Sequence, residues 1–511
     1  MTYSDELKKE FNYTRTGNGD VTYKSSLNKN LDLFYNAGGV RGNNYYGDKP
    51  SYDDYISLFW DAYEENPVLA TKNLFNIRDF RTNGKGERDL FRSLVVSLSN
   101  ENEALVHNLV LSGVFEEFGR FDDLVVLYSN TTSNSVKSAV AHHIKQVLLE
   151  DIANMQDDKQ ITLLAKWLPT NTRNKKVYSI GKSLAKDLGL TFSDYRKTVS
   201  KLRKYLNVLE VNMSSKNYSN IDYSKVPSRA FAKNTAAFYR NDPDNITSFM
   251  EKVKSGEVSL KTSGITPDEV VGKFTEYSYW STVLSDLSDE QVEALELTWK
   301  ELVKNAKDAG NTLVMADVSG SMNGKPMEVS VALAILFAQS SQGQFHNMFM
   351  TFSGRPDLIN ISSHDSLQQI ISKVLSADWD NNTDVDAAFS KILSTAVESN
   401  SKQEDLPERL VIISDMQFDQ SGANNVHIKR WKSKFEQHGY TLPTVVYWNV
   451  SASNGVPARA DEDGVALVSG FTPATLDAVL TAKDLTPEAV MLEALNNEVY
   501  NVIDLVYSRN N

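Results

Sequence analysis

The chain has 511 residues, of which 41% are hydrophobic and 23% charged, and this composition is typical of a folded protein, not of a disordered one. It contains no cysteine, which excludes disulfides, zinc–thiolate sites and cysteine nucleophiles. The net charge of −13 argues against nucleic-acid binding by the surface as a whole. The polar N-terminus lacks the apolar core of a signal peptide, and the longest apolar run, at 331–338, is too short to span a bilayer. We therefore expect a cytoplasmic monomer with no membrane partner.

The first three hundred residues divide into an irregular start and a long helical region. Residues 1–50 are rich in Asn, Tyr and Gly without a clear period, and we expect an irregular arm. Across residues 51–308, apolar residues recur at i, i+3, i+4 and i+7 in segments of roughly 10 to 18 residues joined by short links. This pattern predicts an α-helical repeat domain, a HEAT-like solenoid or ring.

Positive charge is concentrated inside this helical region. Residues 159–240 hold 17 Lys and Arg against four acids, a net charge of +13, so the rest of the chain carries −26. Such asymmetry points to an anionic partner or to pairing with the acidic remainder of the chain.

From residue 309 the pattern changes to alternating strands and helices, which predicts a doubly wound α/β domain over 309–511. We expect strands at 312–317, 346–353, 410–415, 443–450 and 464–469, with helices at 325–342, 366–375, 384–399, 424–439 and 472–481. A last amphipathic helix at 486–507 is expected to dock back on the helical region.

Oxygen-bearing side chains follow two of these strands. Asp317, Ser319 and Ser321 come directly after the first strand, and Asp415 ends the third; Thr383 lies before a helix. The carboxyl ends of such strands share the edge of the sheet where ligands bind, and hard oxygens suit Mg²⁺. The simpler alternative is a turn that caps the next helix, and we interpret Asp384 and Asp386 as helix N-terminal charges.

The order DVSGSM (317–322), NTD (382–384) and ISD (413–415) resembles the metal-ion-dependent adhesion site of von Willebrand factor A domains, over residues 310 to about 500. The resemblance implies a Rossmann-like fold and a Mg²⁺, or another divalent cation, held by Asp317, Ser319, Ser321, Thr383 and Asp415. It also implies that an open position on the metal takes a carboxylate or phosphate from a partner.

Four segments of the helical region, at 76–91, 116–125, 163–169 and 223–234, resemble a poorly characterised family of plant, fungal and phage proteins with a von Willebrand A-like domain after the helices. The arrangement is more distantly similar to the Ro autoantigen and its TROVE module. That similarity implies a ribonucleoprotein in which a helical ring binds single-stranded or structured RNA.

The basic stretch supports RNA binding independently, because cations follow a phosphate backbone and interleaved aromatic rings can stack on bases. The aromatic residues are Tyr195, Tyr205, Phe231 and Tyr239. The predicted nucleic-acid-binding residues are Lys166, Arg173, Lys175, Lys176, Arg196, Lys197, Lys201, Arg203, Lys204, Lys225, Arg229, Lys233 and Arg240. The alternatives are a solvated helix face or an interface with the acidic remainder.

The sequence contains no HExxH, GxSxG or Walker motif, so we expect no enzymatic activity. NGKGERD at 83–89 lacks the full phosphate-loop pattern and is interpreted as an inter-helix loop. The leading hypothesis is a Ro-like RNA-binding protein whose von Willebrand A domain offers a Mg²⁺ docking site. The alternatives are a protein-interaction scaffold that binds a partner carboxylate through the metal without RNA and, third, a metal-dependent hydrolase.

Overall fold

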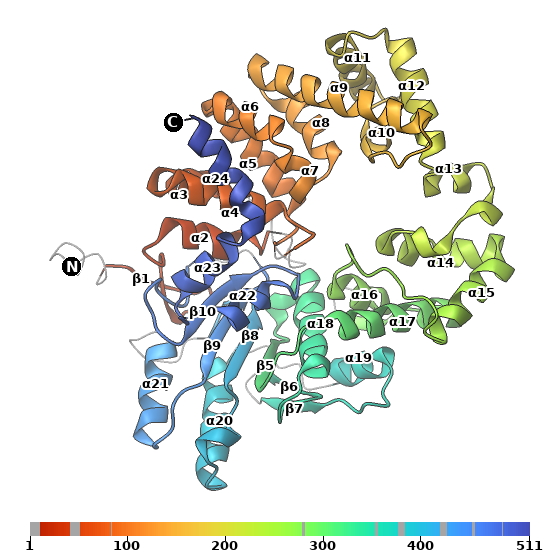
Figure 1. Cartoon of the computed structure of the whole chain (residues 1–511). Coiled ribbons are helices and arrows are strands. Elements are labelled where there is room, and N and C mark those ends of the chain that lie inside the picture. The colour runs from red at the N-terminus through yellow and green to blue at the C-terminus, as the bar shows by residue number, and fades with distance from the viewer. Residues whose placement is uncertain are drawn as a thin grey trace.

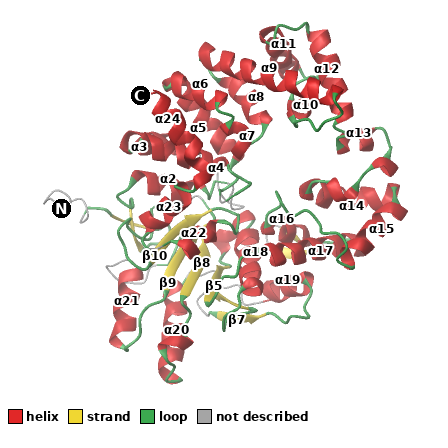
Figure 2. Ribbon diagram, in the orientation of Figure 1, coloured by secondary structure: helices red, strands yellow, loops and turns green. Residues whose placement is uncertain are grey.

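The computed structural model describes residues 11–40, 52–82, 84–277, 282–352, 356–376, 384–419, 427–451, 455–482 and 484–510. Its helical region follows an arc of successive helices (Figures 1 and 2). These helices are α3 (Tyr52–Glu65), α4 (Pro67–Arg78), α5 (Arg88–Glu101), α6 (Glu103–Leu111), α7 (Val114–Phe118), α8 (Phe121–Asn130), α9 (Asn134–Gln156), α10 (Leu164–Trp167), α11 (Lys175–Asp187), α12 (Phe192–Tyr205), α13 (Leu209–Ser214), α14 (Ser228–Asn241), α15 (Pro243–Lys254), α16 (Pro267–Phe274) and α17 (Asp289–Asn305).

The second half of the chain forms one mixed sheet covered by helices. Its strands are β5 (Thr312–Asp317), β6 (Met348–Phe352), β7 (Asp357–Asn360), β8 (Arg409–Ser414), β9 (Thr444–Asn449) and β10 (Val465–Ser469). Its helices are α18 (Lys325–Ser340), α19 (Leu367–Ser376), α20 (Val385–Glu398), α21 (His427–Gln437), α22 (Thr475–Thr481), α23 (Pro487–Leu495) and α24 (Asn501–Asn510). The prediction of a helical part followed by an α/β part is confirmed.

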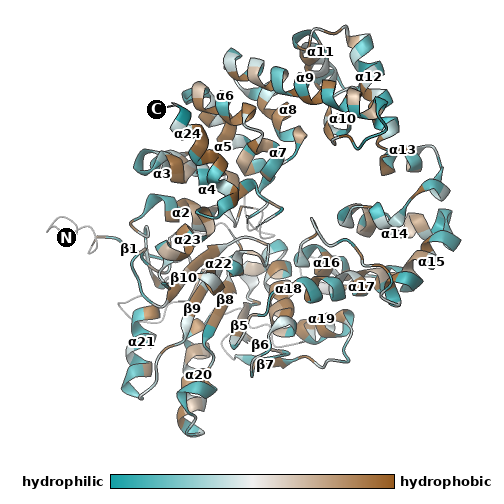
Figure 3. Ribbon diagram, viewed as in Figure 1, coloured by the Kyte–Doolittle hydropathy of each residue, from teal (hydrophilic) through white to brown (hydrophobic). Residues whose placement is uncertain are grey.

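The sheet order is β10-β9-β8-β5-β6-β7, in which β7 alone runs antiparallel to its neighbour. The inner strands are continuous apolar runs buried on both faces, as parallel strands between helix layers require (Figure 3). β7 was not predicted, because its DLIN sequence is only four residues long, is half polar and lies mostly exposed at the edge of the sheet.

The N-terminal residues differ from the irregular arm expected for residues 1–50. Residues 11–40 contain the hairpin β1 (Tyr13–Arg15) and β2 (Val21–Tyr23), followed by α2 (Lys29–Ala37), whose side chains are mostly buried. The hairpin is bonded to the sheet domain: Thr16 Oγ1 donates to the Phe418 carbonyl at 2.7 Å, and the Tyr23 N–H donates to the Val456 carbonyl at 3.0 Å. Long-range packing orders this segment, and a local period does not reveal such packing.

Both ends of the helical arc contact the sheet domain (Figure 1). At one end α2, which packs on α3 and α4, also packs on β10. At the other end α16 packs so closely on α18 that a Cβ at Gly272 would lie 2.6 Å from Glu328 Oε2. The chain also returns to its start, because Tyr500 and Ile503 are buried in the core of the first helices. The expected C-terminal docking is therefore confirmed, although the segment is two helices, α23 and α24, broken near Asn496.

Among the described residues, no helix combines the length and apolar character needed to cross a membrane.

Candidate functional site

The first candidate site lies where the sheet reverses its strand order. The chain passes from β5 to β6 on one side, and later adds β8 on the other side of β5. The carboxyl ends of β5 and β8 therefore flank a topological switch point, which is where open α/β sheets bind ligands. β5 ends at Asp317, and Asp415 directly follows β8.

Hydrogen bonds join the two strand ends. Asp317 Oδ2 accepts from the Ser414 hydroxyl at 2.5 Å, and Asp317 Oδ1 accepts from the Ser319 N–H at 2.9 Å. The hydroxyl oxygens of Ser319 and Ser321 lie 3.1 Å apart. Asp415 Oδ1 accepts from the Gln417 N–H at 3.1 Å. The structure thus brings together four of the five predicted metal ligands.

The two carboxylates are buried, and neither makes an ion pair with a described residue. Burial raises the pKa of Asp317 to about 7, and the nearby negative charge of Asp415 adds to the shift. Burial also raises the pKa of Asp415, against the opposing effect of its hydrogen bonds. Buried, uncompensated carboxylates with adjacent hydroxyls are a donor set that fits a small divalent cation such as Mg²⁺. Ser321 is only half-buried, so the cluster has a solvent-facing side.

The fifth predicted ligand, Thr383, lies outside the described residues. Its neighbour Asp384 caps α20 by accepting from the Ala387 N–H at 2.9 Å, and Asp386 accepts from Arg430 Nη2 at 2.9 Å. Asp384 is the N-cap of α20 and Asp386 lies in its first turn, in agreement with their interpretation as helix N-terminal charges. Among the described residues, no three His, Asp or Glu side chains gather as a metal-binding group.

The second candidate site is the set of basic residues on α11, α12 and α14, here called the basic surface; α11 packs on α12, and α14 follows further along the arc after α13 (Figure 1). Nine of the thirteen predicted cations are exposed and make no ion pair with a described residue. These nine are Arg173, Lys175, Lys176, Arg196, Lys197, Lys201, Lys204, Lys233 and Arg240. Sequence reasoning missed Lys182 and Lys186, which are exposed on α11 with the same free charge.

The other four predicted cations have partners inside the protein. Lys166 pairs with Glu210 at 3.0 Å, Lys225 with Asp222 at 3.1 Å, and Arg229 with Glu269 at 2.7 Å. Arg203 donates to the carbonyls of Ala165 and Leu168, both at 2.7 Å, so its guanidinium fixes the end of α10.

The aromatic residues predicted to stack on bases are more buried than the predicted cations. Tyr195 and Phe231 are buried and belong to the core, so neither offers a ring to a base. Tyr195 lies on the same face of α12 as the buried Val199 and Leu202, and this spacing is the sequence signal of a core face. Tyr178, by contrast, is 37% exposed on α11 between Lys175 and Lys182. Among the described aromatic residues of α11, α12 and α14 it is the most exposed, whereas the predicted Tyr205 and Tyr239 are partly buried; sequence reasoning missed Tyr178.

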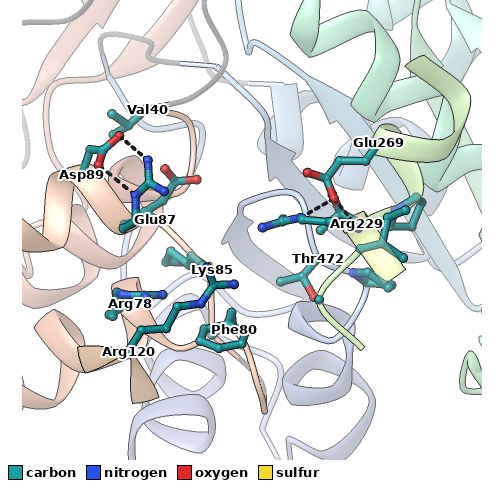
Figure 4. Close-up of a pocket in the computed structure, with 18 of the residues that line it drawn as sticks. Val40, Arg78, Phe80, Lys85, Glu87, Asp89, Arg120, Arg229, Glu269 and Thr472 are labelled. Carbon is teal, nitrogen blue, oxygen red and sulfur yellow. Dashed lines mark hydrogen bonds and ion pairs between the residues drawn. The ribbon is translucent and has the colours of Figure 1, made fainter. Parts of the chain in front are cut away.

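A cavity of about 670 Å³ lies where the two ends of the helical arc meet the sheet domain (Figure 4). One wall comes from the loop between α4 and α5 and from Arg120, before α8. The opposite wall comes from Arg229 on α14 and from the residues around the start of α16. Thr472 and Pro473, after β10, complete the lining. Five cationic and three acidic residues are among those that line it: Arg78, Lys85, Arg88, Arg120, Arg229, Glu87, Asp89 and Glu269.

Comparison with known proteins identifies two families along the chain. Residues 173–312 match a family described as a domain of unknown function (DUF2828), and residues 311–503 match a second one (DUF7788). The two matches overlap at residues 311–312, at the start of β5.

Over 96% of its length the chain is 30% identical to the uncharacterized protein L728 of Acanthamoeba polyphaga mimivirus, and it covers 89% of that protein. The chain therefore belongs to the same family as this viral protein. The crystal structure of the Deinococcus radiodurans Ro (RSR) protein aligns with 92% of this chain and all of its own, with a TM-score of 0.42 and 13% identity.

Proposed function

We propose that this protein binds RNA, single-stranded or structured, through the basic surface of α11, α12 and α14, and that it acts by binding, without catalysing a reaction. The observation that carries the proposal is the set of nine exposed cations that make no ion pair with any described residue. The principal alternative, pairing with the acidic remainder of the chain, is disfavoured because the pairs that do form are few and use nearby carboxylates such as Asp222 and Glu210.

The charge of this surface is suited to a phosphate backbone. Each cation that neutralises a phosphate releases a condensed counterion, so binding is driven by salt-dependent entropy and needs no particular base sequence. Lys175, Tyr178 and Lys182 follow the i, i+3 and i+7 spacing of a single helix face, which places an exposed ring between two cations. That arrangement combines electrostatic attraction with stacking, as in other single-strand-binding surfaces.

We further propose that Asp317, Ser319, Ser321 and Asp415 hold a Mg²⁺, with Thr383 as the fifth ligand. When bound, the ion offers a Lewis-acidic position to an anionic group of a partner. Asp317 and Asp415 supply the negative charge that retains the ion, and Ser319 and Ser321 supply neutral oxygens near the solvent-facing side. This arrangement favours a second candidate function, in which the sheet domain is a scaffold that binds a carboxylate of an acidic protein.

Titration of fluorescent single-stranded RNA at several salt concentrations tests the RNA proposal. Replacing Lys197 and Lys201 with Ala should make the plot of log K against log salt shallower by about 1.4, since each phosphate contact contributes about 0.7 for single strands. The matched control replaces two exposed lysines of the sheet domain, Lys391 and Lys432, which carry no ion pair with a described residue. RNA binding that is independent of salt, or an equal change in both variants, would contradict the proposal.

A further inference from the structure

The cavity between the two ends of the arc has an asymmetric arrangement of charge. On its second wall, Arg229 pairs with Glu269, and at its entrance Arg88 holds Asp89 through two hydrogen bonds of 3.0 and 3.3 Å. Arg78, which is buried, pairs with Asp123 at 2.7 Å. Arg120 is different, because it is half-buried and makes no ion pair with a described residue. Among the four arginines that line the cavity, Arg120 is therefore the one that no described carboxylate pairs with directly.

Aromatic rings orient Arg120, and other arginines lie close enough to repel it. Its Cζ lies 5.1 Å from the centroid of the Phe80 ring and 5.6 Å from that of Trp167, so cation–π contacts orient the guanidinium. The Cζ of Arg78 lies 5.2 Å from the same Phe80 ring. Burial, together with the positive charges of Arg78 and Arg229, lowers the pKa of Arg120 against the opposing effect of Asp122 and Asp123. Guanidiniums that converge from two walls repel one another, and an anion between them would relieve this repulsion.

The glycine-rich loop at 84–86 does not supply the anion site itself. The N–H groups of Lys85, Gly86 and Glu87 donate to the carbonyls of Asn76, Asp79 and Ile77 at 2.7 to 2.9 Å. Lys85 points into the interior, where Nζ contacts Ser469 Oγ at 3.1 Å and lies 3.9 Å from the centroid of the Phe34 ring. The loop is thus a structural link between helices, and recognition of an anion in this cavity would rest on the arginines.

The remaining lining residues define the rest of the ligand. Ile265, Leu302 and Pro473 give the cavity apolar surface beside the arginines, and Tyr52 exposes 38% of its area at the edge. A volume of about 670 Å³ is within the range that holds a ligand of nucleotide size. Guanidiniums also match the geometry of phosphate oxygens better than ammonium groups do.

We infer that this cavity binds the phosphate group of a nucleotide between Arg120 and Arg229, with the base against the apolar lining (Figure 4). The nucleotide is either free in solution or the 5′-phosphorylated end of an RNA strand. The second source depends on the RNA binding proposed above, whereas the first does not. In both cases Arg120 anchors the phosphate, and Arg229 is shared between the phosphate and Glu269.

Calorimetric titration of the full chain with AMP, UMP and inorganic phosphate tests the first source. Competition between 5′-phosphorylated and 5′-hydroxyl oligomers of the same RNA tests the second. Two variants remove the arginines from opposite walls: Arg120→Met keeps the packing of the side-chain stem, and Arg229→Gln changes a half-exposed residue. Loss of a charge-assisted phosphate contact should weaken nucleotide binding roughly 10- to 100-fold in each variant.

The outcomes are separable from those of the RNA proposal. The variant in which Lys197 and Lys201 are replaced with Ala should bind nucleotide as the wild type does, while its RNA salt dependence falls. Arg120→Met should retain salt-dependent RNA binding but lose any preference for the 5′-phosphorylated oligomer. The inference is overturned if, at millimolar concentration, nucleotides bind no better than inorganic phosphate and 5′-phosphorylated ends bind no better than 5′-hydroxyl ends. It is also overturned if both arginine variants bind as the wild type does while their thermal unfolding is unchanged.

Discussion

The hydroxyl of Ser414 donates a hydrogen bond of 2.5 Å to Asp317 Oδ2 and so joins the carboxyl ends of β8 and β5. Residues that are nearly one hundred positions apart in the sequence thereby form one buried, oxygen-rich cluster. The parallel pairing of β5 with β8, in which Ala316 lies beside Ile413, fixes this relationship. The sheet therefore fixes the two strand ends from which a metal ion at this cluster would be held.

Replacing Asp317 with Asn should abolish binding of Mn²⁺, used as a paramagnetic substitute for Mg²⁺. The amide keeps the size of the side chain and removes the negative charge that retains the ion. Electron paramagnetic resonance of free Mn²⁺ measures binding, and wild-type protein should also gain thermal stability as Mn²⁺ is added. Asp384→Asn is the matched control, because Asn caps a helix as well as Asp does and Asp384 is not an expected ligand. Mn²⁺ binding that persists in Asp317→Asn would refute the ligand assignment.

Arg203 and Lys204 are adjacent on α12, but substitution of Arg203 should change the stability of the fold, whereas substitution of Lys204 should change RNA binding. Arg203→Ala removes hydrogen bonds to the carbonyls of Ala165 and Leu168 and should lower the free energy of unfolding by about 2 to 3 kcal/mol. Lys204 is exposed without an ion pair, so Lys204→Ala should leave stability within about 0.5 kcal/mol of the wild type. It should instead reduce the salt dependence of RNA binding by about 0.7.

Chemical denaturation and RNA titration of both variants measure these effects. Should Arg203→Ala prove as stable as the wild type while the RNA salt dependence falls, Arg203 would belong to the RNA-binding surface and not to the end of α10.

The sheet was predictable because its signals are local. Apolar runs such as Leu313–Ala316 predict buried strands, and strand order then places Asp317 and Asp415 at one edge. The basic surface was predictable as a region, but not residue by residue. The roles of Arg203 and Tyr195 depend on what α10 and the core place beside them. Periodicity would have assigned Tyr195 to the core, and the interleaving of aromatic and basic residues obscured that signal.

The cavity could not be predicted, because its walls come from segments that only the closed path of the chain brings together. Arg120 precedes α8, Arg229 lies on α14, and Thr472 follows β10. No local pattern distinguishes these residues from other arginines and threonines. Phe80, which orients Arg120, also occupies a loop whose sequence gives no sign of its cation–π contacts.

Lys85 should make stability depend on pH. Burial lowers its pKa to about 7, against the opposing effect of Glu87. The unfolded chain keeps the ordinary lysine pKa and so binds the proton between pH 7 and about 10.5, where the folded protein has lost it. The contribution of Lys85 to the free energy of unfolding should therefore rise with pH across this window and be lowest below pH 7.

Lys85→Met removes this titration. The free energy of unfolding of the variant minus that of the wild type should be about 2 to 3 kcal/mol larger at pH 6 than at pH 9, because only the wild type gains stability as the pH rises. Denaturant unfolding at the two pH values measures the difference, and Lys182→Met, at an exposed lysine, should show none. A difference that is the same at both pH values would mean that Lys85 stays protonated in the folded protein.

Tyr500 should be the residue through which the C-terminal segment stabilises the first helices. Its ring is fully buried and stacks on Phe118 with centroids 4.9 Å apart, and its hydroxyl donates to Asp79 Oδ2 at 3.2 Å. Tyr500→Ala leaves a large cavity and removes one of the hydrogen bonds to Asp79, which still accepts from Arg81 and Thr82, and it should lower the free energy of unfolding by about 3 to 5 kcal/mol. Leu505→Ala changes a residue that is 56% exposed on the same segment and should have little effect. Thermal unfolding compares the two variants, and equal shifts would show that the C-terminal segment is not a structural link between the sheet domain and the helices.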